Sequence, residues 1–235
     1  MIVPTFNEAE SAPRLISRIN ELIPHLDVLV VDDGSPDGTA DLVQAMCNNA
    51  SSSQIHILRR SEKQGLGSAY IAGFVWGIEH GYQTLIEMDA DGSHRPEDLI
   101  SLLQVFHSDK SLDLVIGSRW VNGGVVRNWG KRRELLSRVA NKYANLILRV
   151  GINDVTAGFR VYKTSIIQEI DFSTVLSQGY CFQIEMTRKV FQLNGKIREV
   201  PITFIEREFG ISKMNIKIVI EAMLRVTLWG IKPKK

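Results

Sequence analysis

The first 118 residues alternate short apolar runs with segments of helical periodicity, and this alternation restricts the fold more than any other feature. A short strand begins at Ile2-Val3, and further apolar runs lie at 28–31, 55–58, 84–88 and 114–117. Helical patterns lie between and after them at 9–22, 39–48, 67–80 and 96–106. This order is typical of βα units that build a mostly parallel sheet. We therefore predict an α/β fold, and a further strand near 198–205.

The charges of the chain are segregated, although its 235 residues carry a formal net charge of only +2. Residues 1–118 carry 7 Lys/Arg against 17 Asp/Glu, whereas residues 119–149 carry 8 against 1 and residues 213–235 carry 6 against 1. The length suits one domain, and 44% hydrophobic residues exclude a disordered chain. Cys47 and Cys181 do not make a disulfide framework, which favours a reducing compartment.

The sequence has no pattern typical of a signal peptide or a membrane-spanning helix. Residues 1–4 lead directly into a polar segment, and no apolar run approaches the roughly 20 residues that span a bilayer. The best candidate, 216–231, is interrupted by Lys217, Glu221 and Arg225, which form one charged stripe on a helix. Such a helix either packs on its own domain or lies on a membrane surface or a partner helix.

Paired acids follow two of the predicted strands. Asp32-Asp33 ends one strand, and Asp89 and Asp91 follow another. Because ligands bind beyond the carboxyl ends of strands in open α/β sheets, these acids are placed to meet a ligand. Asp89 and Asp91 predict a site for Mg²⁺ or Mn²⁺ shared with phosphates, and the alternative is that both cap the turn before Pro96. His94 either contacts this site or packs in the turn.

Two later segments, 154–160 and 207–213, each combine glycine, a hydroxyl group and a cation. A guanidinium group recognises phosphate through two parallel hydrogen bonds, and a lysine adds a mobile point charge. Either segment alone is compatible with a solvated loop. Together with Arg119 they predict contacts to more than one phosphate.

The basic segment 119–150 contains an amphipathic run from 135 to 150, in which Arg138, Lys142 and Arg149 lie between apolar residues. This pattern favours an interfacial helix beside anionic lipid, where each basic residue contributes about 1 kcal/mol. Nucleic-acid binding is the competing interpretation. The acidic half of the chain would repel a long polyanion, so we expect no nucleic-acid partner.

Several motifs resemble those of a known enzyme family. Pro4-Thr5-Phe6-Asn7-Glu8, the segment 32–39 and Asp89-Ala90-Asp91 are similar to family 2 glycosyltransferases of GT-A fold. Segments 117–119, 156–160 and 207–213 resemble more narrowly the dolichol-phosphate (polyprenol-phosphate) mannosyltransferases. The resemblance covers nearly the whole chain.

With the charge pattern, the resemblance implies a single GT-A (Rossmann-like) domain at 1–212 with a mostly parallel sheet and basic amphipathic helices. This domain contains a basic, acceptor- or membrane-facing insert at 119–150. A C-terminal amphipathic helix and basic tail follow at 213–235.

The resemblance also implies an activity. It implies that mannose is transferred with inversion from GDP-mannose to a polyprenyl (dolichyl) phosphate, with Mg²⁺ or Mn²⁺ bound. The protein is expected to be peripheral on the cytoplasmic face of a membrane, held there by a membrane-anchoring partner protein. The alternatives are a related transferase that places glucose or another sugar on polyprenyl phosphate, and a non-catalytic nucleotide- or lipid-binding subunit.

Site residues are implied by the positions that match the family motifs. Those for GDP-mannose are Pro4, Phe6, Glu8, Val31, Asp33, Asp89, Ala90, Asp91, Arg119, Arg207 and Lys213. Those for the acceptor phosphate are Arg119, Arg133, Arg160 and Ser212. Asp89, Asp91 and Arg119 form the catalytic group, with the metal held by the two acids. The family usually has Tyr where Phe6 stands, so stacking is retained there without the hydroxyl.

A phosphate acceptor simplifies the expected chemistry. Its second pKa is about 6, so it is largely dianionic at neutral pH and needs no general base. The site must instead offset the charges of two phosphate groups. We therefore expect Asp91→Ala to abolish transfer, and Arg119→Ala to reduce transfer far more than it reduces stability.

Overall fold

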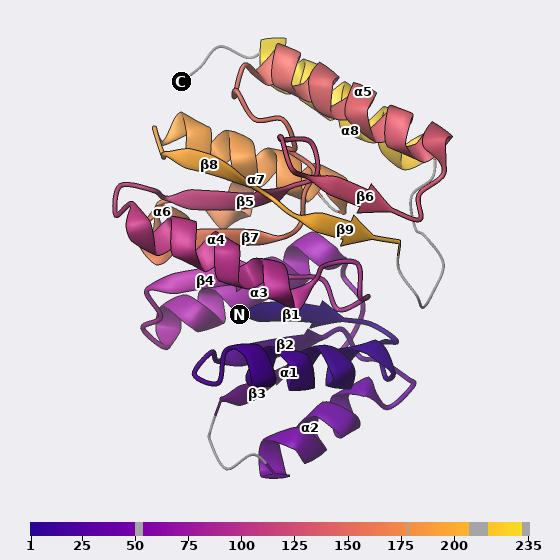
Figure 1. The fold of residues 1–235 in the computed structure, drawn as a ribbon, viewed down its shortest axis with the longest axis vertical. Helices are drawn as coiled ribbons and strands as arrows, with labels where there is room; N and C mark the ends of the chain where they lie inside the picture. The colour runs from indigo at the N-terminus through magenta and orange to yellow at the C-terminus, as the bar shows by residue number, and fades with distance from the viewer. Residues whose placement is uncertain (50–53, 178, 207–215, 232–235) are drawn as a thin grey trace.

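The computed structural model describes residues 1–49, 54–177, 179–206 and 216–231. It is one layered α/β unit in which helices cover both faces of a seven-stranded sheet (Figure 1). The strand order is β3-β2-β1-β4-β7-β5-β8, and of these strands β7 runs antiparallel to both of its neighbours. The predicted α/β fold with a mostly parallel sheet is confirmed.

The first five strands lie where the apolar runs predict them. The strands of the large sheet are β1 (Ile2–Thr5), β2 (Val28–Asp32), β3 (Ile55–Arg59), β4 (Thr84–Glu87), β5 (Leu114–Ser118), β7 (Arg160–Lys163) and β8 (Ile197–Pro201). The small sheet pairs β6 (Val125–Arg127) with β9 (Thr203–Ile205). The helices are α1 (Ser11–Leu22), α2 (Thr39–Asn49), α3 (Leu66–Glu79), α4 (Pro96–Ser108), α5 (Lys131–Leu148), α6 (Thr164–Gln168), α7 (Tyr180–Gln192) and α8 (Ile216–Ile231), with a 3-10 turn at Phe172–Thr174.

Alternating side chains of the strands divide the core into two layers. In β2, Leu29 and Val31 belong to the layer that includes α3 and α7, whereas Val28 and Val30 belong to the layer with α1, α2 and α4. This alternation follows from the period of two in a strand. A strand buried on both faces reads as a continuous apolar run, as the 28–31 segment does.

The second half of the chain differs from its sequence-based prediction. The single strand predicted at 198–205 is two strands, because β8 pairs with β5 while β9 pairs with β6 in the other sheet. The chain changes sheets at Ile202, which is buried, and the Asp98 carboxylate accepts the next N–H, that of Thr203. The four-residue strand β7, the small strand β6 and helix α7 were not predicted.

The C-terminal helix α8 packs on its own domain, against α5 and α7. Val226 joins the core layer, and the hydroxyls of Tyr143 and Thr227 are 2.6 Å apart. Of the two interpretations of this helix, packing on its own domain is confirmed, and it leaves one face exposed. The proposed boundary at 212/213 lies outside the described residues and stays a prediction. In the described part of the chain, no helix combines the length and the apolar character needed to cross a membrane.

Candidate active site

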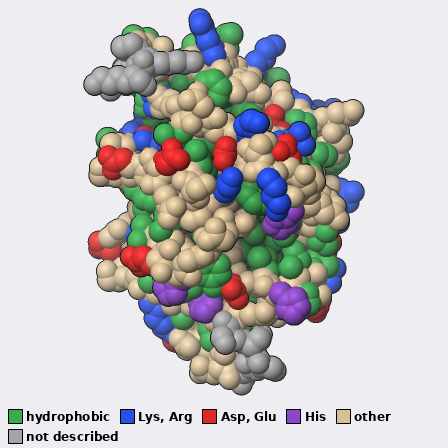
Figure 2. Space-filling view, turned by 90° about the vertical axis from the view of Figure 1, so that its left-hand side faces the viewer, with side chains coloured by type: hydrophobic (Ala, Val, Ile, Leu, Met, Phe, Trp, Pro, Cys, Tyr) green, Lys and Arg blue, Asp and Glu red, His purple; other side chains and the backbone are tan. Residues whose placement is uncertain are grey.

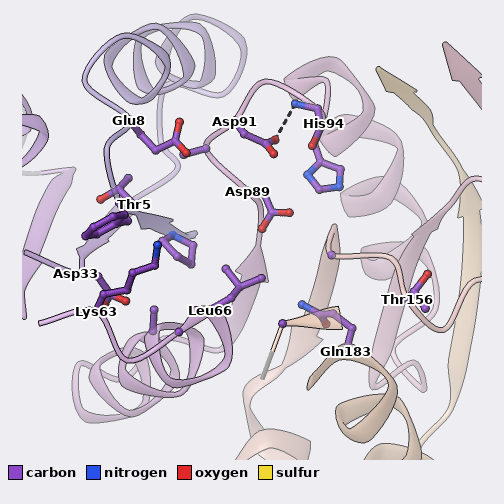
Figure 3. A pocket seen from close by; sticks show the side chains of 18 of the residues that line it. Thr5, Glu8, Asp33, Lys63, Leu66, Asp89, Asp91, His94, Thr156 and Gln183 are labelled. Atoms are coloured by element: carbon purple, nitrogen blue, oxygen red, sulfur yellow. Dashed lines mark hydrogen bonds between the residues drawn. The ribbon is translucent and has the colours of Figure 1, made fainter. Parts of the chain in front are cut away.

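A cavity of about 630 Å³ opens beyond the carboxyl ends of β1, β2, β4 and β5. Its volume is typical of sites that bind small molecules. Figure 3 shows Asp89 between two groups of side chains, with Asp33 and Lys63 on one side and Thr156 and Gln183 on the other. These groups come from distant parts of the sequence, because neighbouring strands bring their ends to one edge of the sheet.

The two predicted metal ligands lie in this cavity, and each is held by a hydrogen bond. The Tyr70 hydroxyl donates to Asp89 Oδ1 at 2.9 Å, and the Ser93 N–H donates to Asp91 Oδ1 at 3.0 Å (Figure 3 draws the second). Burial and the neighbouring Asp89 raise the pKa of Tyr70 well above 10, so its hydroxyl stays a donor at neutral pH.

These two acids fit a hard divalent cation in their chemistry. Carboxylate oxygens are the protein ligands that Mg²⁺ prefers, and Mg²⁺ commonly shares its remaining positions with phosphate and water. Among the described residues, no group of three or more His, Cys, Asp or Glu side chains is arranged to hold a metal ion. An ion held by Asp89 and Asp91 would therefore complete its coordination with ligand phosphate or water.

One end of the cavity combines an aromatic ring with paired charges. Lys63 Nζ lies 3.8 Å from the centre of the Phe6 ring, and Arg60 Nη1 lies 2.7 Å from Asp33 Oδ1. Burial raises the pKa of Asp33, and the charge of Arg60 opposes that effect. A flat ring beside a fixed carboxylate suits a nucleoside, which offers a base to stack and hydroxyls to hydrogen-bond.

His94 is buried between the rings of Phe159 and Phe204, each 5.3 Å away between centres. Burial lowers its pKa to about 4, against the opposing charge of Asp91, so the imidazole is neutral at pH 7. His94 therefore packs in the turn and also lines the cavity, and its predicted contact with a metal or phosphate stays a prediction.

Arg119 is a fixed cation that also lines the cavity. Its guanidinium contacts both oxygens of the buried Asp154, at 2.7 Å from Nε and 2.6 Å from Nη2. The rings of Trp120, Trp129 and Phe204 lie 5.2 to 5.5 Å from the guanidinium carbon. Such a cation is held by its surroundings before any ligand binds, and its removal would leave a buried carboxylate unpaired.

The structure brings together most of the predicted site residues that it describes. Those that line the cavity are Pro4, Phe6, Glu8, Asp33, Asp89, Ala90, Asp91 and Arg119. Val31 lies behind them in the core, paired in register with Pro4 of β1. Arg133 forms an ion pair with Glu206 and covers the ring of Trp129. Arg207, Ser212 and Lys213 lie outside the described residues.

Arg160 does not reach the cavity, and its predicted contact with an acceptor phosphate is corrected here. It is the first residue of β7 and is fully buried. Its guanidinium donates to the carbonyls of Ala157 at 2.6 Å and Val155 at 2.8 Å, and to the Tyr162 hydroxyl at 3.2 Å. Because β7 lies in the middle of the sheet, this cation lies in the core, where it donates hydrogen bonds to main-chain carbonyls of the turn before β7.

The lining residues that were not predicted as site residues include Lys63, Thr156, Gln183 and Arg225. Thr156 lies in a segment that was assigned to phosphate only as a whole. Arg225 belongs to the charged stripe predicted on the C-terminal helix, and that stripe is the signal that could have found it. Gln183 lies on α7, a helix that the sequence analysis did not predict.

Comparison with known proteins agrees with this geometry. Residues 1–171 match the family described as glycosyl transferase family 2. The chain belongs to this family, and it is therefore a glycosyltransferase.

Two relatives are close over nearly the whole chain. The polyprenol monophosphomannose synthase of Mycolicibacterium smegmatis is 49% identical over 232 residues, which are 99% of this chain and 86% of that protein. The undecaprenyl-phosphate mannosyltransferase of Micrococcus luteus is 48% identical over 230 residues, which are 98% of this chain and 93% of that protein.

Solved structures share the fold at much lower identity. The glucosyl-3-phosphoglycerate synthase of Mycobacterium tuberculosis in complex with UDP has a TM-score of 0.67 and 17% identity, covering 96% of this chain and 78% of that chain. The same enzyme with Mn²⁺ and UDP-glucose also has a TM-score of 0.67, covering 97% of this chain and 76% of that chain.

Proposed function

We propose that this protein transfers mannose, with inversion, from GDP-mannose to a polyprenyl phosphate. The observation that carries the proposal is a single cavity lined both by Asp89 and Asp91 and by the fixed cation Arg119. Opposite charges in one cavity suit a reaction between two phosphate-bearing substrates, one of which also needs a cation. The names of the two close relatives, which specify a mannosyl transfer and a polyprenyl phosphate, support the same substrates.

On the donor side, Asp89 and Asp91 would hold Mg²⁺ or Mn²⁺. When bound, the ion supplies positive charge to the diphosphate that leaves the sugar. Phe6 and Asp33 would bind the nucleoside, with Lys63 above the Phe6 ring. A glycosyltransferase of the same fold forms a complex with Mn²⁺ and UDP-glucose, which supports a divalent cation in general.

On the acceptor side, the phosphate requires cations and no general base. It is already largely dianionic at neutral pH, since its second pKa is about 6. Arg119 and Arg225 both line the cavity, and Arg225 comes from α8. We assign these two residues to the acceptor phosphate in place of Arg160.

We also propose that the exposed face of α5 and α8 contacts a lipid surface. The two helices lie side by side at one end of the molecule, and Figure 2 shows blue basic side chains projecting from that end. Leu146 on α5 is 73% exposed and Leu224 on α8 is 61% exposed. Exposed leucines interspersed with Arg138 and Lys142 match the apolar and anionic layers of a bilayer surface.

This face is continuous with the cavity at α8, because Leu224 of the exposed face and Arg225 of the cavity lining are adjacent in the sequence. A polyprenyl chain in the bilayer would then present its phosphate to Arg225. Cys47 and Cys181 are free thiols, which favours a reducing compartment, so we assign the reaction to the cytoplasmic face of the membrane. A membrane-anchoring partner protein would add to the affinity of this face.

Leu146→Glu is expected to weaken binding to vesicles that contain anionic lipid by about tenfold or more, because burying one leucine is worth about 1.5–3 kcal/mol. Co-sedimentation of the purified chain with vesicles of phosphatidylglycerol and phosphatidylcholine measures this. Leu42→Glu is the matched control, since Leu42 is 46% exposed on α2 at the other end of the molecule. Equal binding of both variants would contradict the proposed lipid-facing surface.

Transfer itself is tested by incubating the purified chain with labelled GDP-mannose, a short polyprenyl phosphate, and Mn²⁺ or Mg²⁺. We expect an acid-labile labelled lipid that fails to form when the metal is chelated. Labelled UDP-glucose in a parallel reaction tests the rival donor. If a labelled lipid forms from UDP-glucose alone, the donor is UDP-glucose and not GDP-mannose. If no labelled lipid forms from either donor, the proposed reaction is contradicted.

A further inference from the structure

Tyr70 is a fully buried residue of α3 whose hydroxyl reaches the end of β4. It donates to Asp89 Oδ1 at 2.9 Å. A bond between a hydroxyl and a carboxylate is charge-assisted and stronger than one between neutral groups. Tyr70 therefore fixes one oxygen of the Asp89 side chain from below the cavity.

The other oxygen of Asp89 faces the cavity wall. A Cβ atom placed on Gly158 would lie 3.3 Å from Asp89 Oδ2, so this oxygen approaches a residue that lines the cavity. Figure 3 shows the carboxylate of Asp89 directed into the space between the two groups of lining side chains. The hydroxyl on one side and the glycine on the other define the orientation of the carboxylate.

The ring of Tyr70 is itself held rigidly. It lies parallel to the ring of Phe182, at 6.1 Å between centres and an angle of 5°. One turn earlier in α3, a Cβ on Gly67 would lie only 2.8 Å from Phe182 Cδ2, so the absence of a side chain there lets Phe182 approach the helix. This close packing of α3 on α7 leaves the Tyr70 hydroxyl little freedom to move.

We propose that Tyr70 is a positioning residue for Asp89, holding its carboxylate in the orientation that binds the divalent cation. The inference rests on the proposed function, in which Asp89 is a metal ligand. Partners in the second coordination shell orient metal ligands, and their loss typically lowers metal affinity by about 10- to 100-fold. Asp91 is positioned differently, by the main-chain N–H of Ser93, so the two ligands depend on separate supports.

Tyr70→Phe tests this inference because it removes the hydroxyl and keeps the ring. Tyr162→Phe is the matched control, since Tyr162 is also fully buried in the same core layer, contacts the same Phe74 ring, and has its hydroxyl bonded to Arg160. Mn²⁺ binding in the presence of GDP is measured by electron paramagnetic resonance on the full chain. GDP binding without metal is measured in parallel.

We expect Mn²⁺ to bind Tyr70→Phe at least about tenfold more weakly than wild type, while the control stays within about twofold. Binding of GDP without metal is expected to be equal in all three proteins. In the background of Asp89→Asn, adding Tyr70→Phe is expected to weaken Mn²⁺ binding no further, because its effect passes through the Asp89 carboxylate.

The possible failures are distinguishable. Mn²⁺ binding that is equal in wild type and Tyr70→Phe would overturn the inference and leave the metal site intact. An equal loss in Tyr162→Phe would also overturn it, because the effect would then follow from losing any buried hydroxyl in this layer. Absence of Mn²⁺ binding to wild type with GDP would overturn both the inference and the proposed metal site.

Discussion

Asp91→Ala is expected to abolish mannosyl transfer, and Asp91→Asn to reduce it by about 100-fold or more. A metal ion contributes several kcal/mol of charge stabilisation, and about 1.4 kcal/mol corresponds to tenfold in rate. The Asn variant is the sharper test, because its amide oxygen can still accept the N–H of Ser93 that Asp91 accepts at 3.0 Å. The change then removes the charge and preserves the turn. Initial rates at saturating GDP-mannose, over a series of Mn²⁺ concentrations, measure the effect.

Asp109→Asn provides a matched control for this substitution. Asp109 accepts the N–H of Ser111, two residues on, at 3.0 Å, so it forms the same local turn as Asp91 with Ser93. It lies after α4 on an exposed part of the surface and does not line the cavity. We expect transfer by Asp109→Asn to equal that of wild type. Normal transfer by Asp91→Asn would contradict the assignment of Asp91 as a metal ligand.

Arg119→Ala is expected to lower the free energy of unfolding by about 3–5 kcal/mol, because breaking one side of a buried ion pair leaves an uncompensated charge. The partner, Asp154, is fully buried and bonded to the guanidinium through both of its oxygens. This result differs from the sequence-based expectation of a variant that loses transfer while largely keeping its stability. Urea unfolding followed by tryptophan fluorescence measures it, since Trp120 and Trp129 flank the guanidinium.

Comparison with the variant Asp154→Asn separates the contribution of Arg119 to phosphate binding from its contribution to stability. This variant breaks the same buried pair from the other side, and we expect it to lose stability as well, yet it keeps the cation in the cavity wall. Under conditions where both variants are folded, Arg119→Ala is expected to raise the KM for the polyprenyl phosphate about tenfold or more, because hydrogen bonds to charged groups contribute about 1.5–3 kcal/mol. A similar KM for the two variants would assign Arg119 a purely structural role.

The acidic part of the site could be predicted because it is local in the sequence. Asp89 and Asp91 follow a buried strand directly, and the rule that ligands bind beyond the carboxyl ends of strands locates them without further information. The same rule applies to Asp33, which follows another strand, whereas the nucleoside-binding roles of Phe6 and Asp33 were implied only by the family resemblance. Burial of cations could not be predicted in this way. Arg119 and Arg160 both looked like phosphate ligands, and only the fold places one in the cavity wall and the other in the core.

Residues that reach the site from helices distant in the sequence were not predicted. The sequence around Tyr70 does not indicate its contact with Asp89, because α3 and the residues after β4 come together only in the folded chain. Gln183 and Arg225 reach the cavity from α7 and α8, which pack around it from the C-terminal part of the chain. The strand β7 is four residues long and begins with arginine, so neither its length nor its composition marked it as a central strand.

The central position of β7 has a consequence for how the chain acquires its structure during synthesis. Strands β1 to β4 can assemble as soon as they have left the ribosome, but β5 pairs only with β7 and β8. The sheet therefore stays in two unconnected parts until Lys163 has emerged, and its far edge waits for Pro201. The acidic half of the chain does not form a complete sheet alone, so a fragment that ends at residue 118 should leave β5 without a neighbour. Because β7 joins β4 to β5 in the middle of the sheet, we expect the residues after 118 to be needed before the sheet is complete.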